Sequence, residues 1–251
     1  MMTESRDKMI QNWFLDLDDT LYEASGGMLK EIHLRMNAFI ARELRMSLDE
    51  ASALRTHFWT TYGCTFIGLW HHYHIDPVVF LTETHDFDPS PYIHYDGNPV
   101  LDVRRLSGKK IIFTNGPQTY AQKVISLLGL EAECDEVISC FEMKLFGDWR
   151  PKPNRSVLIN QCQRLGLKLH QTALVDDTPL NLSVAKSVGM QTVWCTGYRF
   201  KHKRLTHRRP YAYVDYQVPH IRELCRLPQK PRTDEAPSRL KRFANRRQET
   251  T

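Results

Sequence analysis

The stretch Trp13-Phe14-Leu15-Asp16-Leu17-Asp18-Asp19-Thr20-Leu21 decides how this chain folds. An apolar run, typical of a short buried strand, ends there in three aspartates and a threonine. Carboxylates this close repel one another, so a fold gains nothing by gathering them unless a cation compensates their charge. Mg²⁺ takes oxygen ligands and is often held by one or two carboxylates together with substrate phosphate. The stretch therefore predicts a Mg²⁺ site at the end of a buried strand, and chemistry on a phosphate.

Strands and helices alternate strictly in the second half of the chain. We expect strands at residues 109–115, 136–141, 171–175 and 190–195, and helices at 119–128, 154–165 and 179–188. Together with the first strand, placed at residues 9–17, this order predicts an α/β fold. The expected architecture is a Rossmann-like, doubly wound parallel sheet with helices on both faces.

The segment between the first strand and residue 100 has a different pattern. Apolar residues recur at helical spacing over residues 28–44, and Ser47 and Glu50 have the spacing of a capping box. Residues 86–99 hold three prolines and are typical of a linker. We therefore expect a core of residues 1–20 and 100–227, an inserted helical cap at 21–99, and a basic tail at 228–251 whose composition favours disorder.

Composition limits the class of protein. The 251 residues are 41% hydrophobic and 25% charged, and no apolar run approaches the ~18 residues that a membrane helix needs. Residues 1–11 are polar and lack the apolar core of a signal peptide. Six scattered cysteines form no CxxC pair. We expect a cytoplasmic monomer or homodimer with reduced thiols and no contact with a membrane.

Charge is distributed unevenly along the chain. From residue 199 onward there are 15 Lys or Arg against 5 Asp or Glu, whereas the first 198 residues hold 19 against 24. The basic tail could bind nucleic acid weakly through its charge. It has few aromatic residues between the basic ones and matches no recognised nucleic-acid module, so we expect a solvated tail rather than a nucleic-acid-binding protein.

Polar side chains follow three of the predicted strands. In an open parallel sheet, ligands bind outside the carboxyl ends of the strands. The strand ends, together with the Arg-Pro-Lys-Pro segment at 150–153, supply Asp16, Asp18, Thr114, Asn115, Lys152, Asp176 and Asp177. Carboxylates, a hydroxyl, an amide and one ammonium suit a phosphoryl group that Mg²⁺ bridges to a carboxylate.

Four motifs in this order resemble those of the haloacid dehalogenase-like (HAD) phosphatases. They are Asp-Leu-Asp-Asp-Thr at 16–20, Phe-Thr-Asn-Gly at 113–116, Arg-Pro-Lys-Pro at 150–153 and Val-Asp-Asp-Thr at 175–178. The resemblance implies that Asp16 is a nucleophile that becomes a phospho-aspartate. It implies that Asp18 is the general acid for the leaving oxygen and then the base for water. Thr114 and Lys152 would hold the phosphoryl oxygens, with the backbone of Asn115 nearby.

The same resemblance implies a ligand set for Mg²⁺. The ligands would be the Asp16 carboxylate, the Asp18 main-chain carbonyl and the Asp177 carboxylate, with Asp176 acting through a metal-bound water. Asp19 is expected to face solvent or to cap the following turn. Within the superfamily, dehalogenases lack a carboxylate two residues after the nucleophile and transport ATPases carry threonine there. Asp18 therefore favours a phosphatase or, less strongly, a phosphomutase.

A narrower resemblance lies in the cap. Several segments there resemble the pyrimidine 5′-nucleotidase branch. They are Tyr62-Gly63-Cys64-Thr65, Gly68-Leu69, His85-Asp86-Phe87 and Tyr92-Ile93, followed by Lys110-Ile111-Ile112-Phe113-Thr114-Asn115 of the next strand. This implies hydrolysis of nucleoside 5′-monophosphates such as UMP or CMP. Tyr62, Thr65 and His72 are candidate contacts to base or ribose, and ordinary packing within the cap is the alternative for all three.

Other interpretations stay open at this point. The substrate could be a sugar phosphate, phosphoglycolate or FMN, or the chain could be a non-catalytic binding protein that works through its basic tail. His71-His72-Tyr73-His74 lacks zinc-ligand spacing, so surface or cap-interface histidines are expected. Trp59 and Trp70 are expected in the core, although one of them could face the mouth of the active site.

Overall fold

A six-stranded parallel sheet forms the centre of the computed structural model, which describes residues 9–202 and 211–231. The strand order is β3-β2-β1-β6-β7-β8, and every pairing is parallel. The strands are β1 (Asn12–Leu15), β2 (Lys109–Phe113), β3 (Glu136–Ile138), β6 (Thr172–Asp176), β7 (Gln191–Cys195) and β8 (Tyr216–Val218). The predicted α/β class and parallel sheet are confirmed.

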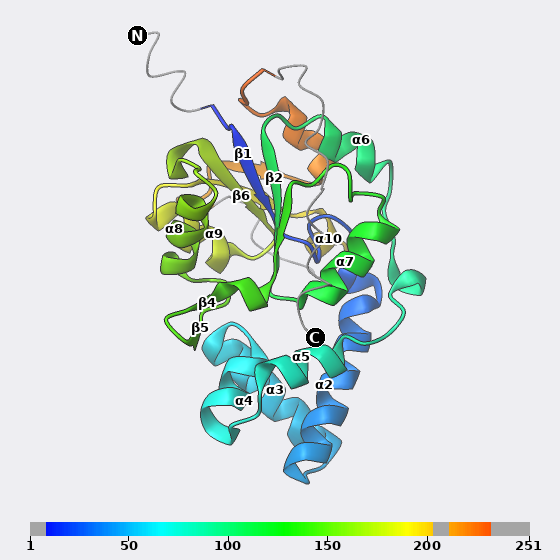
Figure 1. The fold of residues 1–251 in the computed structure, drawn as a ribbon. Coiled ribbons are helices and arrows are strands. Elements are labelled where there is room, and N and C mark those ends of the chain that lie inside the picture. The colour runs from blue at the N-terminus through cyan, green and yellow to red at the C-terminus, as the bar shows by residue number, and fades with distance from the viewer. Residues whose placement is uncertain (1–8, 203–210, 232–251) are drawn as a thin grey trace, which may run out of the picture.

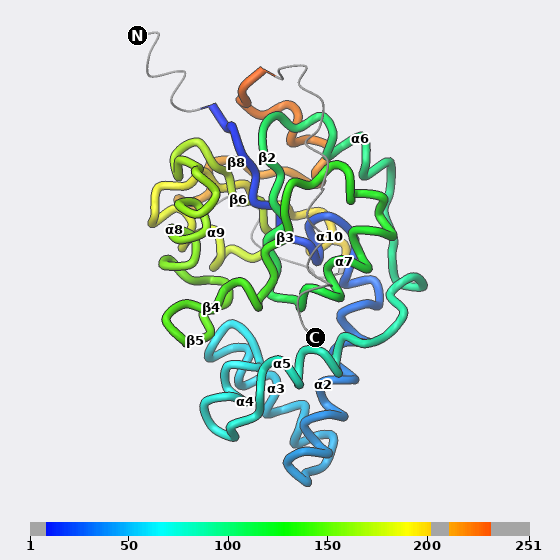
Figure 2. Tube along the Cα trace, in the orientation of Figure 1, coloured from blue at the N-terminus to red at the C-terminus, as the bar shows by residue number. Residues whose placement is uncertain are grey.

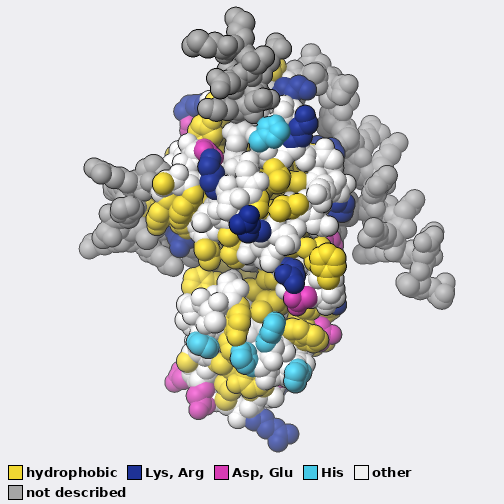
Figure 3. All heavy atoms as spheres, turned by 90° about the vertical axis from the view of Figure 1, so that its left-hand side faces the viewer, with side chains coloured by type: hydrophobic (Ala, Val, Ile, Leu, Met, Phe, Trp, Pro, Cys, Tyr) yellow, Lys and Arg dark blue, Asp and Glu magenta, His cyan; other side chains and the backbone are white. Residues whose placement is uncertain are grey.

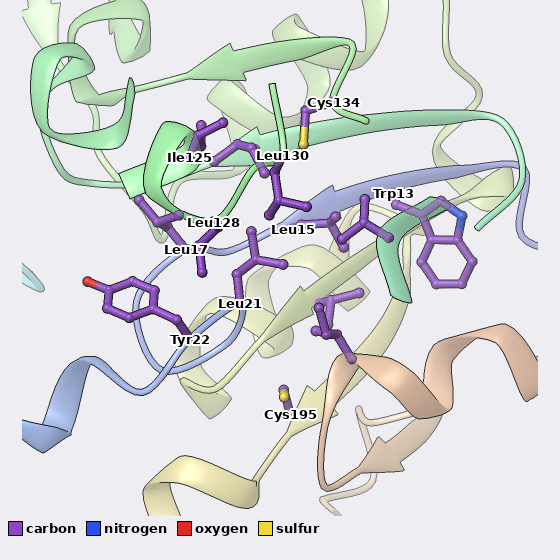
Figure 4. Close-up of a cluster of buried hydrophobic side chains, with 14 of the residues drawn as sticks. Trp13, Leu15, Leu17, Leu21, Tyr22, Ile125, Leu128, Leu130, Cys134 and Cys195 are labelled. Atoms are coloured by element: carbon purple, nitrogen blue, oxygen red, sulfur yellow. The ribbon is translucent and has the colours of Figure 1, made fainter. Parts of the chain in front are cut away.

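Helices cover both faces of this sheet because alternate side chains of the buried strands point to opposite sides. Trp13 and Leu15 of β1 belong to one hydrophobic cluster (Figure 4), and Phe14 belongs to another on the opposite face. Helices α6 and α7 contribute to the first cluster, and α8 and α9 to the second. The helices of this region are α6 (Pro99–Arg104), α7 (Gln118–Leu127), α8 (Arg155–Arg164), α9 (Pro179–Ser187) and α10 (Gly197–His202).

Some elements differ from the sequence-based expectation. Strand β3 ends at Ile138, not at residue 141, because Ser139 and Glu142 form a capping box that begins a 3₁₀ turn. A short hairpin, β4 (Lys144–Leu145) and β5 (Asp148–Trp149), follows. The first four residues of the expected tail, 228–231, are described, and Pro228 and Lys230 exchange backbone hydrogen bonds with Ile10. Residues 232–251 lie outside the described part of the chain.

A helical region stands below the sheet, on the side where β1 ends (Figure 1). It consists of α2 (Met28–Leu44), α3 (Leu48–Tyr62), α4 (Thr65–Tyr73) and α5 (Pro77–Thr84). The capping box of Ser47 and Glu50 is present at the start of α3. Residues 16–27 and 85–98 connect this cap to the sheet (Figure 2), and Glu23 N donates to His94 O across the two linkers. No described helix is long and apolar enough to cross a membrane.

The cap rests directly on the loops at the carboxyl edge of the sheet. Phe66 of α4 and Trp149 of β5 meet edge to face with ring centroids 6.1 Å apart. At the α3–α4 turn, a Cβ on Gly63 would lie 3.2 Å from Cδ of Pro153 and 3.6 Å from the carbonyl oxygen of Lys152. The cap therefore contacts the loop that carries Lys152.

The cap surface is rich in histidine and exposes both tryptophans. His57, His71, His72 and His74 are exposed, as expected of surface histidines (Figure 3). Trp59 and Trp70 are 55% and 39% exposed, so the expectation that they lie in the core is wrong. Both sit on helix faces turned away from Phe58 and Leu69, which fill the cap interior.

The second linker begins at a buried histidine. The Nδ1–H of His85 points between Leu81 O at 2.9 Å and Thr84 Oγ1 at 3.0 Å. Because Leu81 O can only accept and Thr84 Oγ1 already donates to Phe80 O, His85 Nδ1 is the donor. Burial lowers the pKa of His85 to about 4.

We predict that His85 makes stability fall in acid. The unfolded chain takes up a proton near the ordinary pKa of about 6.5, whereas folded His85 does so only near 4. Lowering the pH from 6.5 to 4 should thus cost up to about 3 kcal/mol of unfolding free energy. In His85→Leu, urea unfolding across this range should lose that part of the pH slope. An unchanged slope would contradict the assignment.

We predict that Gly68→Ala destabilises the cap. In a helix the change should stabilise by about 1 kcal/mol, but the new Cβ would lie 2.1 Å from Cγ of Phe58. Overpacking of this kind costs about 1–3 kcal/mol, measured by urea unfolding. In a Phe58→Leu background the cost of Gly68→Ala should shrink. A Gly68→Ala variant as stable as the parent would show that the cap repacks freely.

Candidate functional site

Three aspartates from two neighbouring strands meet at the carboxyl edge of the sheet. Asp16 follows β1, Asp176 ends β6 and Asp177 comes next. The register of the two strands sets this meeting, and Asp16 N donates to Val175 O at 2.9 Å. Each residue offers one carboxylate oxygen, and the three atoms lie within 4.8 Å of one another. In the described residues this is the one such group of His, Cys, Asp or Glu that could hold a metal ion.

Lys152 is buried among these carboxylates. Its Nζ lies 2.5 Å from Asp16 Oδ1 and 3.1 Å from Asp176 Oδ2. The side chain of Asn115 holds the loop in place: its Oδ1 accepts from Lys152 N at 2.8 Å, and its Nδ2 donates to Lys152 O at 3.0 Å. Sequence reasoning placed the Asn115 backbone near the phosphoryl group and missed this positioning role of the amide.

Two hydroxyls complete this part of the site. Thr114 follows β2 directly and is 1% exposed; its Oγ1 accepts from Gly116 N at 3.0 Å. That leaves the Thr114 hydroxyl hydrogen free to be donated. Thr20 Oγ1 is directed at Asp16 Oδ2 at 3.4 Å.

Asp176 and Asp177 differ in how far the protein satisfies them. Both Asp176 oxygens are used: Thr178 N donates at 2.9 Å, and Asn181 Nδ2 lies 2.9 and 3.0 Å from them. Asp177 receives Thr178 Oγ1 at 3.0 Å and has a long contact of 3.4 Å between Oδ2 and Arg199 Nη1. Asp177 is therefore the freer metal ligand, and Asp176 suits an indirect role.

Electrostatics show that the cluster lacks positive charge. Burial and the neighbouring Asp176 raise the pKa of Asp177 to about 7, against the pull of Arg199. Burial also raises the pKa of Asp16. Lys152 opposes this increase, and the carboxylates of Asp176 and Asp177 add to it. Burial opposes the charge on Lys152, but the ion pairs with Asp16 and Asp176 overcome it and raise its pKa.

A divalent cation fits this donor set. Three carboxylates face one buried ammonium and the partly exposed guanidinium of Arg199, so negative charge remains. The free donors are oxygens, which Mg²⁺ prefers over nitrogen or sulfur. Burial and then mutual repulsion raise the pKa values of Asp16 and Asp177, and a cation bound by both would offset these effects.

Asp18 and Asp19 are not members of this carboxylate cluster and have partners of their own. Asp18 Oδ1 accepts from Tyr22 OH and from Tyr120 OH, each at 2.6 Å. Asp19 has a φ of 57° and is 6% exposed. It accepts from Ser25 N at 2.7 Å and from Ser25 Oγ. Asp19 therefore caps the turn before α2, which was one of the two alternatives expected from the sequence. It does not face solvent, which was the other.

The cap residues proposed for base or ribose contacts are less tightly tied to the site. Tyr62 OH lies 2.7 Å from Nε2 of His72, whose ring stacks on Phe58. Thr65 is buried and donates to Arg55 O at 3.2 Å. No hydrogen bond between described residues joins any of the three to the carboxylates. The α3–α4 turn between Tyr62 and Thr65 does reach the Lys152 loop, as described above.

Known proteins resemble this chain over most of its length. The family model described as haloacid dehalogenase-like hydrolase matches residues 12–189. Phosphate metabolism protein 8 of Saccharomyces cerevisiae is 26% identical over 189 residues, which cover 71% of this chain and 59% of that protein.

Solved structures share the fold. A HAD phosphatase from Thermococcus onnurineus superimposes with a TM-score of 0.60 at 22% identity, covering 87% of this chain and 97% of that one. An L-2-haloacid dehalogenase from Xanthobacter autotrophicus gives 0.54 at 17% identity, covering 87% and 98%. At these identities the structures establish the fold alone, and both a phosphatase and a dehalogenase have it.

We predict that Mg²⁺ stabilises the protein through Asp177. Saturating Mg²⁺ should raise the melting temperature by about 5 °C, because a ligand at a hundred times its Kd adds about 2.7 kcal/mol. Asp177→Asn should lose this shift, and without metal it should be at least as stable as the parent because one repelling carboxylate is gone. Asp148→Asn, on the β5 hairpin, is the matched control and should keep the shift. An equal shift in Asp177→Asn would contradict the proposed ligand set.

Proposed function

The chain belongs to the haloacid dehalogenase-like hydrolases, and within this family we propose that it is a Mg²⁺-dependent phosphatase with Asp16 as nucleophile. The observation that carries the proposal is the constellation of Asp16, Lys152 and Asp177 beside Asp18. Dehalogenases of the family have no carboxylate at the position of Asp18. An acid there has a use only where a leaving oxygen needs a proton.

In the proposed reaction each residue of the site has a separate role. An Asp16 carboxylate oxygen attacks phosphorus, a phospho-aspartate forms and the bond from phosphorus to the leaving oxygen breaks. Asp18 gives its proton to that oxygen and then takes one from the water that hydrolyses the phospho-aspartate. Lys152 and the free hydroxyl hydrogen of Thr114 bind the phosphoryl oxygens, where negative charge must be offset.

Mg²⁺ would be held by the carboxylates of Asp16 and Asp177 and the main-chain carbonyl of Asp18, with Asp176 acting through a water. When bound, it neutralises charge on the phosphoryl group and fixes its orientation. Asp16 can serve as nucleophile only while ionised. Lys152 at 2.5 Å and the cation both favour that ionised form against burial.

For the substrate we propose a pyrimidine nucleoside 5′-monophosphate, UMP or CMP. The support is the resemblance of the cap segments and the position of the α3–α4 turn, where Gly63 approaches Lys152 O. In this proposal Tyr62, Thr65 and His72 contact the base or ribose. Thr65 would accept a hydrogen bond there, because its hydrogen is donated to Arg55 O. The cap covers the phosphoryl group and limits the entry of bulk water.

We predict that phosphate release requires Mg²⁺ and is fastest with UMP or CMP. The screen compares UMP, CMP, AMP, GMP, ribose 5-phosphate, phosphoglycolate and FMN, with Mg²⁺ and with EDTA. Asp16→Asn should lower kcat by about a thousandfold or more, since the attacking oxygen is lost. Asp148→Asn should match the parent.

The outcomes of this screen separate the levels of the proposal. Hydrolysis of ribose 5-phosphate, phosphoglycolate or FMN without UMP or CMP would replace the nucleotidase assignment by another metabolite phosphatase. If the Asp16→Asn variant still hydrolysed the substrate, the assignment of Asp16 as nucleophile would be wrong. If none of the substrates were hydrolysed, the proposal that the protein is a phosphatase would be wrong.

A further inference from the structure

We propose that Tyr22 and Tyr120 are positioning residues that aim Asp18 at the leaving oxygen of the substrate. The proposal rests on the phosphatase function above and adds two residues that neither the motifs nor the family roles include. It identifies what fixes the orientation of the general acid in this chain. It also ties that orientation to both linkers of the cap.

Three oxygens form a closed triangle at this point. Tyr22 OH and Tyr120 OH each lie 2.6 Å from Asp18 Oδ1 and 2.6 Å from one another. Tyr22 is fully buried and Tyr120 is 1% exposed, whereas Asp18 is partly exposed. A tyrosine hydroxyl keeps its hydrogen at neutral pH, so each of the two can donate. Two O–H groups thus converge on a single carboxylate oxygen.

The other oxygen of Asp18 is left for the substrate. No described residue donates a hydrogen bond to Oδ2, and Asp18 is more exposed than either tyrosine. A carboxyl held at one oxygen cannot rotate freely about its Cβ–Cγ bond. Fixing Oδ1 therefore fixes the direction of Oδ2. Such orientation matters because a displacement of about 1 Å can cost a hundredfold in rate.

Each tyrosine is connected to one of the two linkers of the cap, although Tyr120 itself lies in α7. Tyr22 lies in the first linker, four residues after Asp18. The ring of Tyr120 packs edge to face on His85, at 5.2 Å, where the second linker begins, and a Cβ on Gly116 would lie 3.0 Å from that ring. The triangle therefore joins both connections of the cap to the loop that carries Thr114. A cap displaced from its place would also disturb the aim of Asp18.

The test uses two substrates of nearly the same shape. With phenyl phosphate the leaving oxygen is basic. It needs the Asp18 proton while the bond from this oxygen to phosphorus breaks and the bond from Asp16 to phosphorus forms. With p-nitrophenyl phosphate the leaving oxygen is weakly basic and departs without it. We compare kcat/KM, which reports formation of the phospho-aspartate and not its hydrolysis. The ratio of the two values, taken on one preparation, does not depend on how much of a variant is folded.

Tyr22→Phe and Tyr120→Phe should each lower kcat/KM for phenyl phosphate about tenfold, which is part of the rate that a general acid contributes. For p-nitrophenyl phosphate each should lower kcat/KM less than about twofold. In an Asp18→Asn background, either change should cost nothing further, since the tyrosines act through Asp18. Tyr95→Phe is the matched control: its hydroxyl also donates at 2.6 Å to a carboxylate, that of Asp102, away from the site, and it should leave the ratio unchanged.

Equal losses on both substrates would mean that the tyrosines only support the fold and would overturn the inference. So would a gain in rate, no loss on phenyl phosphate, or a further loss in the Asp18→Asn background. If the parent releases phosphate from neither aryl phosphate and from no substrate of the screen above, the proposed function fails and this inference fails with it. An active parent with equal losses in the variants overturns this inference alone.

Discussion

Three carboxylates meet at one edge of the sheet with a single buried ammonium between them, and the rest of the site depends on how that charge is balanced. Asp16 and Asp176 are buried and share Lys152, while among described residues the ion pair of Asp177 is a long contact to Arg199. Buried charge of one sign is costly unless it is paired. The parallel pairing of β1 and β6 enforces the meeting, so the fold retains a repulsion that a bound cation would relieve.

The surroundings of this cluster hold each group in one role. The Asn115 amide binds the backbone of Lys152 on both sides, which keeps the ammonium between the carboxylates. Asn181 and Thr178 saturate Asp176, which leaves Asp177 as the freer ligand. Two residues beyond Asp16, the side chain of Asp18 accepts hydrogen bonds from two tyrosines and is not part of the carboxylate cluster. Neighbouring aspartates of one motif thus differ in chemistry because their partners differ.

The sequence could predict the parts that follow from periodicity and strand ends. The alternation of strands and helices predicted the parallel sheet, and polar residues after strands predicted which side chains approach one another. Asn115, Tyr22 and Tyr120 could not be assigned their roles in the same way, because a hydrogen bond from Tyr120 to Asp18 joins segments 102 residues apart. The short strand β8 has no period long enough to recognise. Trp59 and Trp70 were misplaced because apolar character alone does not show which face of a cap helix is covered.

The central claim is that Asp16 accepts the phosphoryl group, and the most direct test is to look for that group on the protein. The parent is mixed with Mg²⁺ and a hydrolysed phosphomonoester, quenched in acid during turnover, digested and analysed by mass spectrometry. The account predicts a phosphorylated peptide that contains Asp16, and its absence from Asp16→Asn and from samples quenched with EDTA present. Phosphate release by the parent with no phosphoryl group on that peptide, or with one on another residue, would contradict it.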